Sequence, residues 1–575
     1  CALVATPAVA SAETQVMPDG VKAEVLPLTQ ANNEPVQITE PGSYVLKTAE
    51  GEVTPSSGYT IDAPDASRIN PVRIYIDGTV YVNDKTNWRV EQTRWLFNIK
   101  QGSNIEFIGV NNPCVSFHDK SEVRQSVSGF LTDRYYDGGY KNALGNISVS
   151  LWVGDGSKNF SLSYSSGADQ KVPAISLGST EGELTAKFEK LKIQDYAGNS
   201  HAVAGNAQEY AVPVHLFREG RSTTGGNTNS FTATFTGCEF YDTSGDFNGA
   251  VSVDGNSSFK MPKDGSAAEK LTATFNNCSF SGHNGGGNGE NLGVRQTNKS
   301  YKSVEASCYY ENSSILNTYA VAGVMGVTNA TVNLNGCTMS NFHSTRSSSS
   351  DNTLTVDALN VARSARCNIN GGKISRNAAR GNTCVVYAAG TLTLGGSPTI
   401  ASFWKNSHAG DVTAGDGYTE ADIATGTAKS LYIPKKNSSD ATAPALNLAS
   451  DFSVRGGDYH VWISIEETAG SNGVKSRVLG TCESDEIEGV VPDGSSKTDD
   501  NSDKYEVVNL NGDLTFRETI HQHKWNVEAD GLGVRASCVG PFRNSECEYG
   551  KDESGEPKKY LRATYELSMS KATSS

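Results

Sequence analysis

The chain repeats a short phrase, and this repetition constrains its fold more than any other feature. Thr232–Phe240 (TATFTGCEF), Thr272–Phe280 (TATFNNCSF) and Thr331–Met339 (TVNLNGCTM) share an apolar-polar alternation that ends at a cysteine. Alternation with a period of two predicts a strand with one buried face. The Asn-Asn or Asn-Gly pair predicts a bend, after which the apolar parity flips. A bend at that point would keep both halves of the phrase facing inward.

The repeat unit is short once its insertions are removed. Aligning the apolar residue before each bend gives the anchors Phe188, Phe235, Phe275, Ala306, Leu334, Ile369 and Leu394. Polar insertions such as Lys260–Lys270 and Ser344–Asn352 lengthen some steps, and without them the unit is about 25–30 residues, as in solenoids. A second apolar phrase follows in each unit, at Gly249–Val253, Asn291–Val294, Val321–Val327, Asp357–Val361 and Val385–Gly390.

Short strands joined by bends, without helical periodicity, predict an all-β fold. The unit is too short for the blades of a propeller, which take roughly 40–50 residues. It favours a right-handed parallel β-helix, a solenoid whose coils stack about 4.8 Å apart and complete each other's core. We predict this solenoid over residues 36–519. Residues 13–35 are expected to form a lead-in, and residues 520–575 a small C-terminal β-module.

Composition and charge narrow the class of protein. The net charge is −15, and the sequence has no cluster of Lys and Arg of the kind that a nucleic-acid surface needs. Residues 1–12 end in Ala10-Ser11-Ala12, which is typical of a signal-peptide cleavage site and would leave Glu13 first. No later apolar run is long enough to span a membrane. We therefore predict an extracellular protein, with any cell-wall anchor in sequence downstream of Ser575.

A cysteine recurs at the bend of successive units. Cys238, Cys278, Cys308 and Cys337 occupy nearly the same position, and Gly372 and Ser397 replace them in the next two units. A catalytic thiol is used once and needs a histidine to activate it, so a stacked series favours small buried filling. Disulfides between coils stay open, because Cα atoms about 4.8 Å apart lie within bridging range.

One acidic group is a candidate for catalysis. Parallel β-helices often carry polysaccharide lyases and hydrolases, whose chemistry needs paired carboxylates, or Ca²⁺ with a basic residue. Glu239, Asp242 and Asp246 form the best acidic group, although charges on a strand face are usually only solvated. No cofactor is predicted. Ca²⁺ is possible but unsupported, because Lys504 stands where the acidic stretch Asp499–Asp503 would need a glycine.

Aromatic residues in polar loops are candidates for ligand binding. Tyr135, Tyr136 and Tyr140 fall in one turn-rich segment. In equivalent loops of other units lie His283 and the pair Phe342 and His343. Exposed aromatic rings stack on sugars or on protein partners, but the same residues also cap a core beneath a long loop. The two interpretations stay open.

The last segment resembles a module known from bacterial surface proteins. His521, His523, Trp525, Cys538 and Cys547 give a His-x-His-x-Trp…Cys…Cys pattern. This is similar to the small module that follows pectate-lyase-like β-helices in adhesin-like proteins of Gram-positive bacteria. The resemblance implies a secreted or cell-wall-attached protein of adhesin type.

Within that module, the cysteines and histidines allow more than one chemistry. In an oxidising compartment a Cys538–Cys547 disulfide is favoured. A metal site formed by His521, His523 and the two cysteines is an alternative, although no Cys-x-x-Cys knuckle is present. Reduced thiols are the third possibility.

These features together predict a non-catalytic surface binding protein, an adhesin that presents variable loops on a rigid β-helix. Its expected partner is a host surface protein or a glycan, and nucleic acid is excluded. Whether the chain is an enzyme stays open, with the balance toward no. A β-helix polysaccharide lyase or glycoside hydrolase is the alternative, and a purely structural surface stalk is the third candidate.

Overall fold

The computed structural model is all-β over the residues that it describes. These are residues 13–29, 34–55, 57–82, 94–117, 127–132, 146–164, 169–170, 173–179, 182–198, 213–218, 230–241, 243, 248–254, 270–281, 323–328, 330–340, 343–344, 355–361, 365–379, 383–402, 429–435, 443–454, 461–466, 476–492, 505–518, 525–530, 533–538 and 561–564. Every regular element in them is a β-strand, and the long sheets are parallel. The all-β prediction is therefore confirmed.

Most strands belong to three parallel ladders. Ladder 1 contains β3 (Val36–Ile38), β5 (Tyr59–Asp62), β7 (Arg94–Gln101), β9 (Val127–Thr132), β13 (Ile175–Ser179), β17 (Val214–Arg218), β20 (Asn248–Asp254), β23 (Gly323–Thr328), β27 (Thr355–Val361), β30 (Thr383–Ala388), β33 (Lys429–Ile433), β35 (Val461–Ile465) and β37 (Val490–Pro492). Ladder 2 contains β2 (Lys22–Val25), β4 (Gly42–Leu46), β6 (Val72–Tyr81), β8 (Ile105–Phe117), β10 (Ile147–Val153), β14 (Glu183–Glu189), β18 (Ser230–Thr236), β21 (Leu271–Asn276), β24 (Thr331–Asn335), β28 (Arg366–Asn370), β31 (Thr391–Gly395) and β34 (Ala445–Leu448). Ladder 3 contains the ends of β6 and β8, followed by β11 (Phe160–Tyr164), β15 (Leu191–Gln194), β19 (Glu239–Tyr241), β22 (Ser279–Ser281), β25 (Thr338–Ser340), β29 (Lys373–Ala379) and β32 (Thr399–Ser402).

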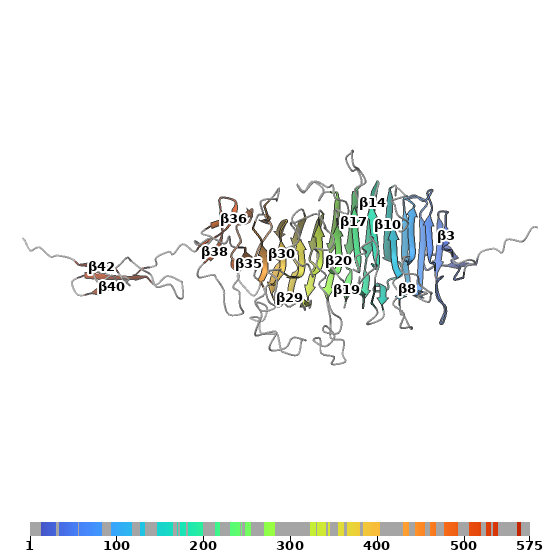
Figure 1. Ribbon diagram of the computed structural model, residues 1–575, viewed down its shortest axis with the longest axis horizontal. Coiled ribbons are helices and arrows are strands. Elements are labelled where there is room, and N and C mark those ends of the chain that lie inside the picture. Colours follow the sequence, from blue (N-terminus) through green and yellow to red (C-terminus); the bar gives the residue numbers. More distant parts are fainter. Residues whose placement is uncertain are drawn as a thin grey trace, which may run out of the picture.

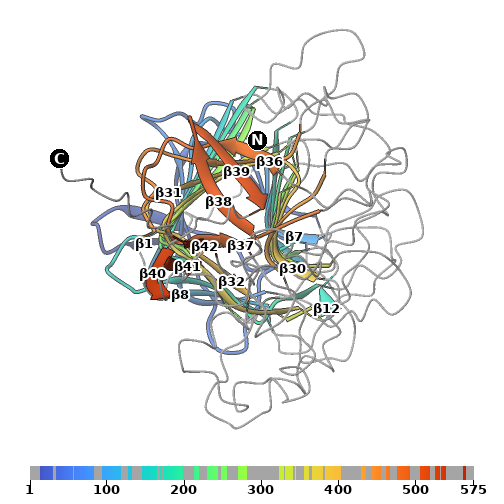
Figure 2. The same cartoon turned by 90° about the vertical axis from the view of Figure 1, so that its left-hand side faces the viewer.

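The chain visits ladders 1, 2 and 3 in turn, and we call each such passage a layer. Strands β30, β31 and β32 form one layer, and each pairs in parallel with its counterpart in the preceding layer, β27, β28 and β29. Figure 1 shows the layers succeeding one another in sequence order along the long axis. Figure 2 looks along that axis and shows β31, β32 and β30 on three different sides. The core lies between the ladders.

The register confirms the apolar anchors of the repeat, with one exception. Phe188, Phe235 and Phe275 are direct neighbours in ladder 2, and the series continues through Leu334 and Ile369. Their side chains are all buried. The Phe235 ring stacks between those of Phe188 and Phe275, with centroids 4.7 Å from each. Apolar residues at equivalent positions therefore stack on one another and fill the core from layer to layer.

The exception is Ala306, which the repeat placed in a layer of its own. Strand β21 pairs directly with β24, so that Phe275 lies beside Leu334 with no strand between them. Ladder 1 behaves in the same way, because β20 pairs directly with β23 and leaves no place for Asn291–Val294. Ala306 and Cys308 lie outside the described residues. The prediction that they add a layer between Phe275 and Leu334 was wrong, because β21 and β24 are direct neighbours.

The predicted bends are confirmed, and their backbone explains their residues. Gly237, Asn277, Gly336, Gly371 and Gly396 follow the ladder 2 strands, and all have φ between 51° and 65°. Glycine and asparagine tolerate this left-handed conformation best. The left-handed residue turns the chain between ladders 2 and 3 while both strands keep their apolar side chains inside.

The cysteine column is buried filling. Register equates the inward residues Phe160, Leu191, Cys238, Cys278, Cys337 and Gly372. The three cysteines of this column form no disulfide, and the Cys337 thiol donates to the Phe275 carbonyl oxygen at 3.2 Å. Hydrogen bonding to Cys238, with burial, raises the pKa of Cys278 to about 12. Thiols that stay protonated are poor nucleophiles, and these ones act as small core residues.

The side chains of this inward column become smaller from Phe160 to Gly372, which has none. A Cβ on Gly372 would lie 2.3 Å from the Cys337 carbonyl oxygen, so only glycine fits there. The prediction that Ser397 comes next in the column was wrong. Ser397 is exposed and donates to the Ser453 carbonyl oxygen at 2.7 Å, and the buried residue at this bend is Pro398. One extra residue in the bend accounts for the shift, which spacing alone did not reveal.

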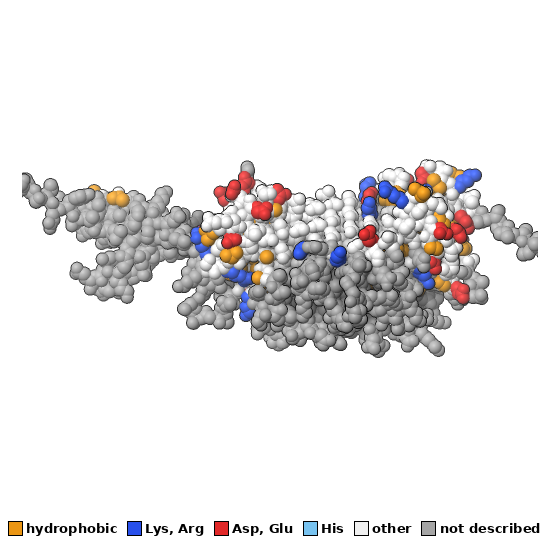
Figure 3. All heavy atoms as spheres, turned by 90° about the horizontal axis from the view of Figure 1, so that it is seen from above, with side chains coloured by type: hydrophobic (Ala, Val, Ile, Leu, Met, Phe, Trp, Pro, Cys, Tyr) orange, Lys and Arg blue, Asp and Glu red, His pale blue; other side chains and the backbone are white. Residues whose placement is uncertain are grey.

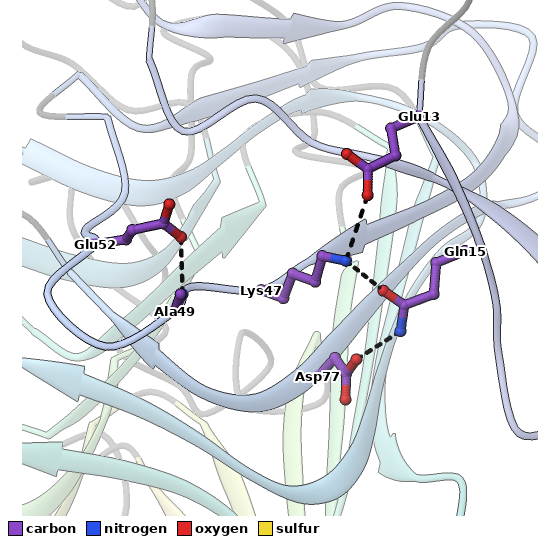
Figure 4. A network of polar contacts seen from close by, with 6 residues as sticks. All are labelled: Glu13, Gln15, Lys47, Ala49, Glu52 and Asp77. Atoms are coloured by element: carbon purple, nitrogen blue, oxygen red, sulfur yellow. Dashed lines mark hydrogen bonds and ion pairs between the residues drawn. The ribbon is translucent and has the colours of Figure 1, made fainter.

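A short antiparallel strand closes the N-terminal end. Strand β1 (Thr14–Val16) pairs with β2, and Gln15 links β6 to Lys47, the residue that follows β4 (Figure 4). The Gln15 amide nitrogen donates to Asp77 at 2.7 Å, and its oxygen accepts from Lys47 at 2.9 Å. Lys47 also lies 3.7 Å from a Glu13 carboxylate oxygen. Ladder 2 is thereby tied on its outside at this end.

Antiparallel sheets occupy the C-terminal part. Strands β36 (Ser476–Thr481), β39 (Asp513–Glu518) and β38 (Tyr505–Leu510) form one sheet, and β40 (Trp525–Asp530), β41 (Gly533–Cys538) and β42 (Leu561–Thr564) form another. Leu514 and Phe516 of β39 are buried in the main core. The sheet formed by β36, β39 and β38 therefore covers the end of the parallel stack. The boundaries at residues 36, 519 and 520 stay predictions.

Two short parallel pairings occur earlier in the chain. The short strands β12 (Asp169–Gln170) and β16 (Ala197–Gly198) pair with each other, and β26 (His343–Ser344) pairs with β29.

Candidate functional site

The three ladders present different outer faces. On ladder 1 the outward residues Thr60, Asn98, Ser176, His215 and Ser252 are polar, yet all are buried. The His215 ring stacks on Phe217, 5.0 Å away. Because these side chains are inaccessible to solvent, the outer face of ladder 1 is not open to a ligand at these five positions.

Ladder 3 has a mixed outer face. One outward column runs through Thr79, Cys114, Ser161, Lys192 and Glu239 in consecutive layers. It combines an ion pair, a hydroxyl and a half-buried thiol, and burial raises the pKa of that Cys114 thiol. This face is irregular in both charge and side-chain size.

The central part of ladder 2 has an open and regular outer face, which we call the Thr/Asn face. Its side chains point outward from β18, β21, β24, β28 and β31. They are Thr232, Thr234, Thr236, Thr272, Thr274, Asn276, Thr331, Asn333, Asn335, Arg366, Asn368, Asn370, Thr391 and Thr393. Each is exposed or half-buried, and Arg366 alone among them is charged. The face is therefore polar, accessible and almost neutral.

Hydrogen bonds between layers hold the side chains of this face in line. The Asn333 amide donates to the Thr274 hydroxyl at 3.1 Å, and the Asn368 amide donates to Asn333 at 2.8 Å. In the next column the Asn335 amide donates to Asn276 at 2.9 Å. Each side-chain amide has two donor hydrogens and an acceptor oxygen, so hydrogen-bonding capacity remains for a ligand.

The spacing of the Thr/Asn face follows from strand geometry. Neighbouring layers lie about 4.8 Å apart, and outward residues along one strand recur every ~6.7 Å. The result is a two-dimensional lattice of hydroxyl and amide groups. Such a lattice can exchange its surface water for the hydroxyl groups of an extended ligand. Threonine hydroxyls without a neighbouring base are weak nucleophiles, whereas they donate and accept hydrogen bonds readily.

The space-filling view shows the same contrast in charge. On the face seen in Figure 3, charged side chains gather toward the two ends of the described surface. The stretch between them is mostly uncharged. Charged groups are therefore few in the middle part of this face.

The acidic group proposed for catalysis is only partly described. Glu239 begins β19, its side chain is 44% exposed, and its carboxylate lies 4.0 Å from the Lys192 amino group. Asp242 and Asp246 lie outside the described residues. Glycoside hydrolysis needs a second carboxylate about 5–10 Å from the first. The interaction that the described structure gives Glu239 is with a cation.

The other candidates fall largely outside the described structure. Tyr135, Tyr136, Tyr140, His283, Phe342, His521, His523 and Cys547 lie outside it, and so do residues 1–12. The backbone of His343 is described in β26, beside Ala378 of β29. Cys538 ends β41, opposite Trp525 of β40. The proposed loop contacts, the Cys538–Cys547 disulfide and the alternative metal site therefore stay predictions.

Two searches of the described residues gave negative results. In those residues no group of three or more His, Cys, Asp or Glu side chains is placed to hold a metal ion. Within the same residues, no helix has the length and hydropathy needed to cross a membrane.

The Thr/Asn face was missed when the sequence was interpreted, although a signal for it was present. The outward positions Thr272 and Thr274 alternate with buried Ala273 and Phe275. The alternation was used to locate the core, and the polar half of the same pattern was treated as ordinary solvent-facing surface. Reading both halves in register would have revealed the lattice.

Comparisons of the chain with protein-family models, with curated proteins and with solved structures gave no match.

Proposed function

We propose that the chain is a secreted or cell-wall-attached binding protein of the adhesin-like kind found on Gram-positive bacteria, built on a right-handed parallel β-helix. In this proposal the layers form a rigid rod and the protein is not an enzyme. The observation that carries it is the Thr/Asn face, a regular and open surface held by cross-layer hydrogen bonds.

The proposed ligand of this face is an extended, uncharged polysaccharide. A sulfated or phosphorylated polymer would find one cation there, Arg366, and an array of neutral groups otherwise. Neutral sugars instead offer hydroxyl groups that donate and accept hydrogen bonds, which match threonine and asparagine. A polymer lying along the stack would meet equivalent groups at every layer, so weak contacts would add up over its length.

The test is binding to a panel of immobilised neutral glycans, together with an assay for released reducing sugar on the same samples. We expect saturable binding without release. The double variant Thr234→Lys/Asn333→Lys places two long charged side chains on the lattice and should weaken binding at least tenfold. A matched control is Leu510→Lys, an exposed position in β38 away from the face.

Three outcomes would oppose the proposal. Release of reducing sugar would favour the lyase or hydrolase alternative, in which Glu239 is the first residue to replace. Unchanged binding by the double variant would move the ligand to another surface. Absence of binding to every neutral glycan would leave the stalk interpretation as the better one.

A further inference from the structure

The bend between ladders 2 and 3 is unusual in the layer of β8. Most layers turn through a single left-handed residue. Here Asn111 and Asn112 both have a φ of 58°, as Gly371 and Gly372 are both left-handed after β28, but only the asparagine pair is followed by a proline, Pro113. The next layer is unusual too, because residues 154–159 separate β10 from β11, where Lys190 alone separates β14 from β15. The longer connection stands beside the wider bend, and a pocket of about 360 Å³ lies between them.

Asp155 fixes the connection in place. Its carboxylate accepts hydrogen bonds from the backbone nitrogens of Asn111 and Ser157 and from the Ser157 hydroxyl. The Asn112 backbone nitrogen donates to the Ser157 hydroxyl oxygen at 3.0 Å. Partial burial raises the pKa of Asp155, but these hydrogen bonds outweigh it and lower that pKa below its ordinary value. These hydrogen bonds therefore hold the bend and the connection together as the wall of the pocket.

The lining of the pocket contains two cations and several hydrogen-bond donors. Lys158 and Lys192 line it, together with the polar side chains of Asn112, Asn159 and Ser161. No acidic side chain lines it. The Asp155 carboxylate is occupied by the backbone donors described above. The two lysines thus line the concavity itself, while the nearest described carboxylates, Asp155 and Glu239, stand outside its lining.

Lys192 is held at the edge of the pocket from the next layer. Its amino group lies 4.0 Å from the Glu239 carboxylate and 5.6 Å from the centre of the Tyr241 ring. At 4.0 Å the ion pair is loose, and partly exposed pairs of this kind contribute little to stability. An incoming anion can therefore compete with Glu239 for this amino group.

We propose that this pocket binds a small tetrahedral oxyanion, the phosphate or sulfate ester of a sugar-sized ligand. Lysine recognises such groups as a point charge, and the serine hydroxyl and asparagine amides supply directional donors. The pocket volume of about 360 Å³ is close to the smallest volumes of small-molecule sites, about 300 Å³, and fits one sugar ring with its ester group. The site is separate from the Thr/Asn face and does not depend on the function proposed for it.

The experiment is isothermal titration calorimetry on the full chain with glucose 6-phosphate, glucose 6-sulfate, inorganic phosphate and unmodified glucose. We expect one saturable site for the esters, weaker binding of inorganic phosphate and none of glucose. The preferred ester identifies the source of the oxyanion. Lys158→Gln/Lys192→Gln should reduce the affinity at least tenfold, and raising the salt concentration should weaken binding of the unaltered chain.

Two further variants make the test specific. Glu239→Gln should strengthen binding, because Lys192 loses its competing carboxylate. Lys187→Gln removes an exposed lysine from ladder 2, outside the pocket, and should leave the affinity unchanged. Equal affinity in Lys158→Gln/Lys192→Gln and the unaltered chain would overturn the proposal, as would no saturable binding of either ester. Loss of binding in Lys187→Gln would show that net charge alone was being measured.

Discussion

The outer face of ladder 2 differs between its N-terminal and central parts, although one column of residues runs through both. In the N-terminal layers this column is Val45, Tyr75 and Ile108, all buried, with half-buried Trp152 packed against their cluster. In the central layers the register continues it through Thr236. The inward face stays apolar throughout, so the outer face changes character while the core does not.

The two parts of the outer column differ in how they avoid exposing apolar side chains to solvent. The N-terminal column is covered, because Met17, which follows β1, and Ala23 of β2 pack on it and the Tyr75 hydroxyl donates to Asp19 at 2.7 Å. The central column is open and has hydroxyls and amides instead. An open apolar sheet face of that size would be an association site for any apolar surface. The difference teaches that the core sets the fold, while the outer face is free to be specialised.

The largest expected effect comes from placing the same charge in both parts of the column. Ile108→Lys buries an ammonium group beneath the N-terminal strands, where Ile108 is 5% exposed, and should cost about 3 kcal/mol or more. Thr236→Lys, on the open part, should change stability by less than about 0.5 kcal/mol. Urea unfolding followed by circular dichroism measures both. Similar losses for the two variants would break the comparison.

The next effect tests whether the core is equally important in the central part. Phe235→Ala removes the middle ring of a stack and should cost about 3–5 kcal/mol, because the neighbouring phenylalanines of two layers cannot close the cavity. Thr234→Ala, one residue away on the outer face, is the control and should cost less than about 0.5 kcal/mol. Comparable unfolding midpoints for these two variants would show that the central layers do not depend on their core.

Acid should have a smaller effect, by increasing amide hydrogen exchange in the N-terminal layers before it does so in the central layers. The folded pKa of Asp155 is below its ordinary value, so its contribution is complete above the unfolded pKa of about 3.9 and is lost as the pH falls through the folded value. Hydrogen exchange below that pH should increase at Asn111 and Ser157 before it increases in β21 or β24. In Asp155→Asn the two amides should exchange faster at neutral pH as well. Equal acid sensitivity of all layers would contradict this order.

The smallest effect concerns the hydrogen bonds of the Thr/Asn face. Asn333→Ala removes the bond to Thr274 and the bond from Asn368, and should cost about 1 kcal/mol because the groups are partly solvated. Asn368→Ala removes one of these bonds and should cost about half as much. Thermal unfolding detects such differences. A loss of several kcal/mol in either variant would mean that the face stabilises the fold as much as the core does.

The core and the bends could be predicted from the sequence because each depends on local patterns. Alternation located the inward residues Phe235, Phe275 and Leu334, and the Asn-Gly pair located the left-handed Gly336. Both signals are confined to a few residues and reflect steric preferences of the backbone.

What could not be predicted depends on which layers are neighbours. Ala306 has a strand-like pattern around it, but the pairing of Phe275 with Leu334 excludes it from ladder 2. Lys192 comes to the pocket because β15 lies beside β11, a fact that spacing along the chain does not contain. The covered outer column of the N-terminal layers was missed for the same reason. Register between layers, and not local pattern, determines these surfaces.

The direct pairing of β21 with β24 has a consequence for how such a chain can change. Strand β22 ends at Ser281 and β23 begins at Gly323, yet the ladder 2 and ladder 3 strands on either side stay in unbroken register. The cost of closing a loop rises only slowly with its length, so such a position accepts chain of widely different lengths. The number of residues in this interval can therefore change without changing the number of layers. A foreign peptide inserted between Ser281 and Gly323 should be displayed without disturbing the scaffold, which makes this interval a natural site for grafting.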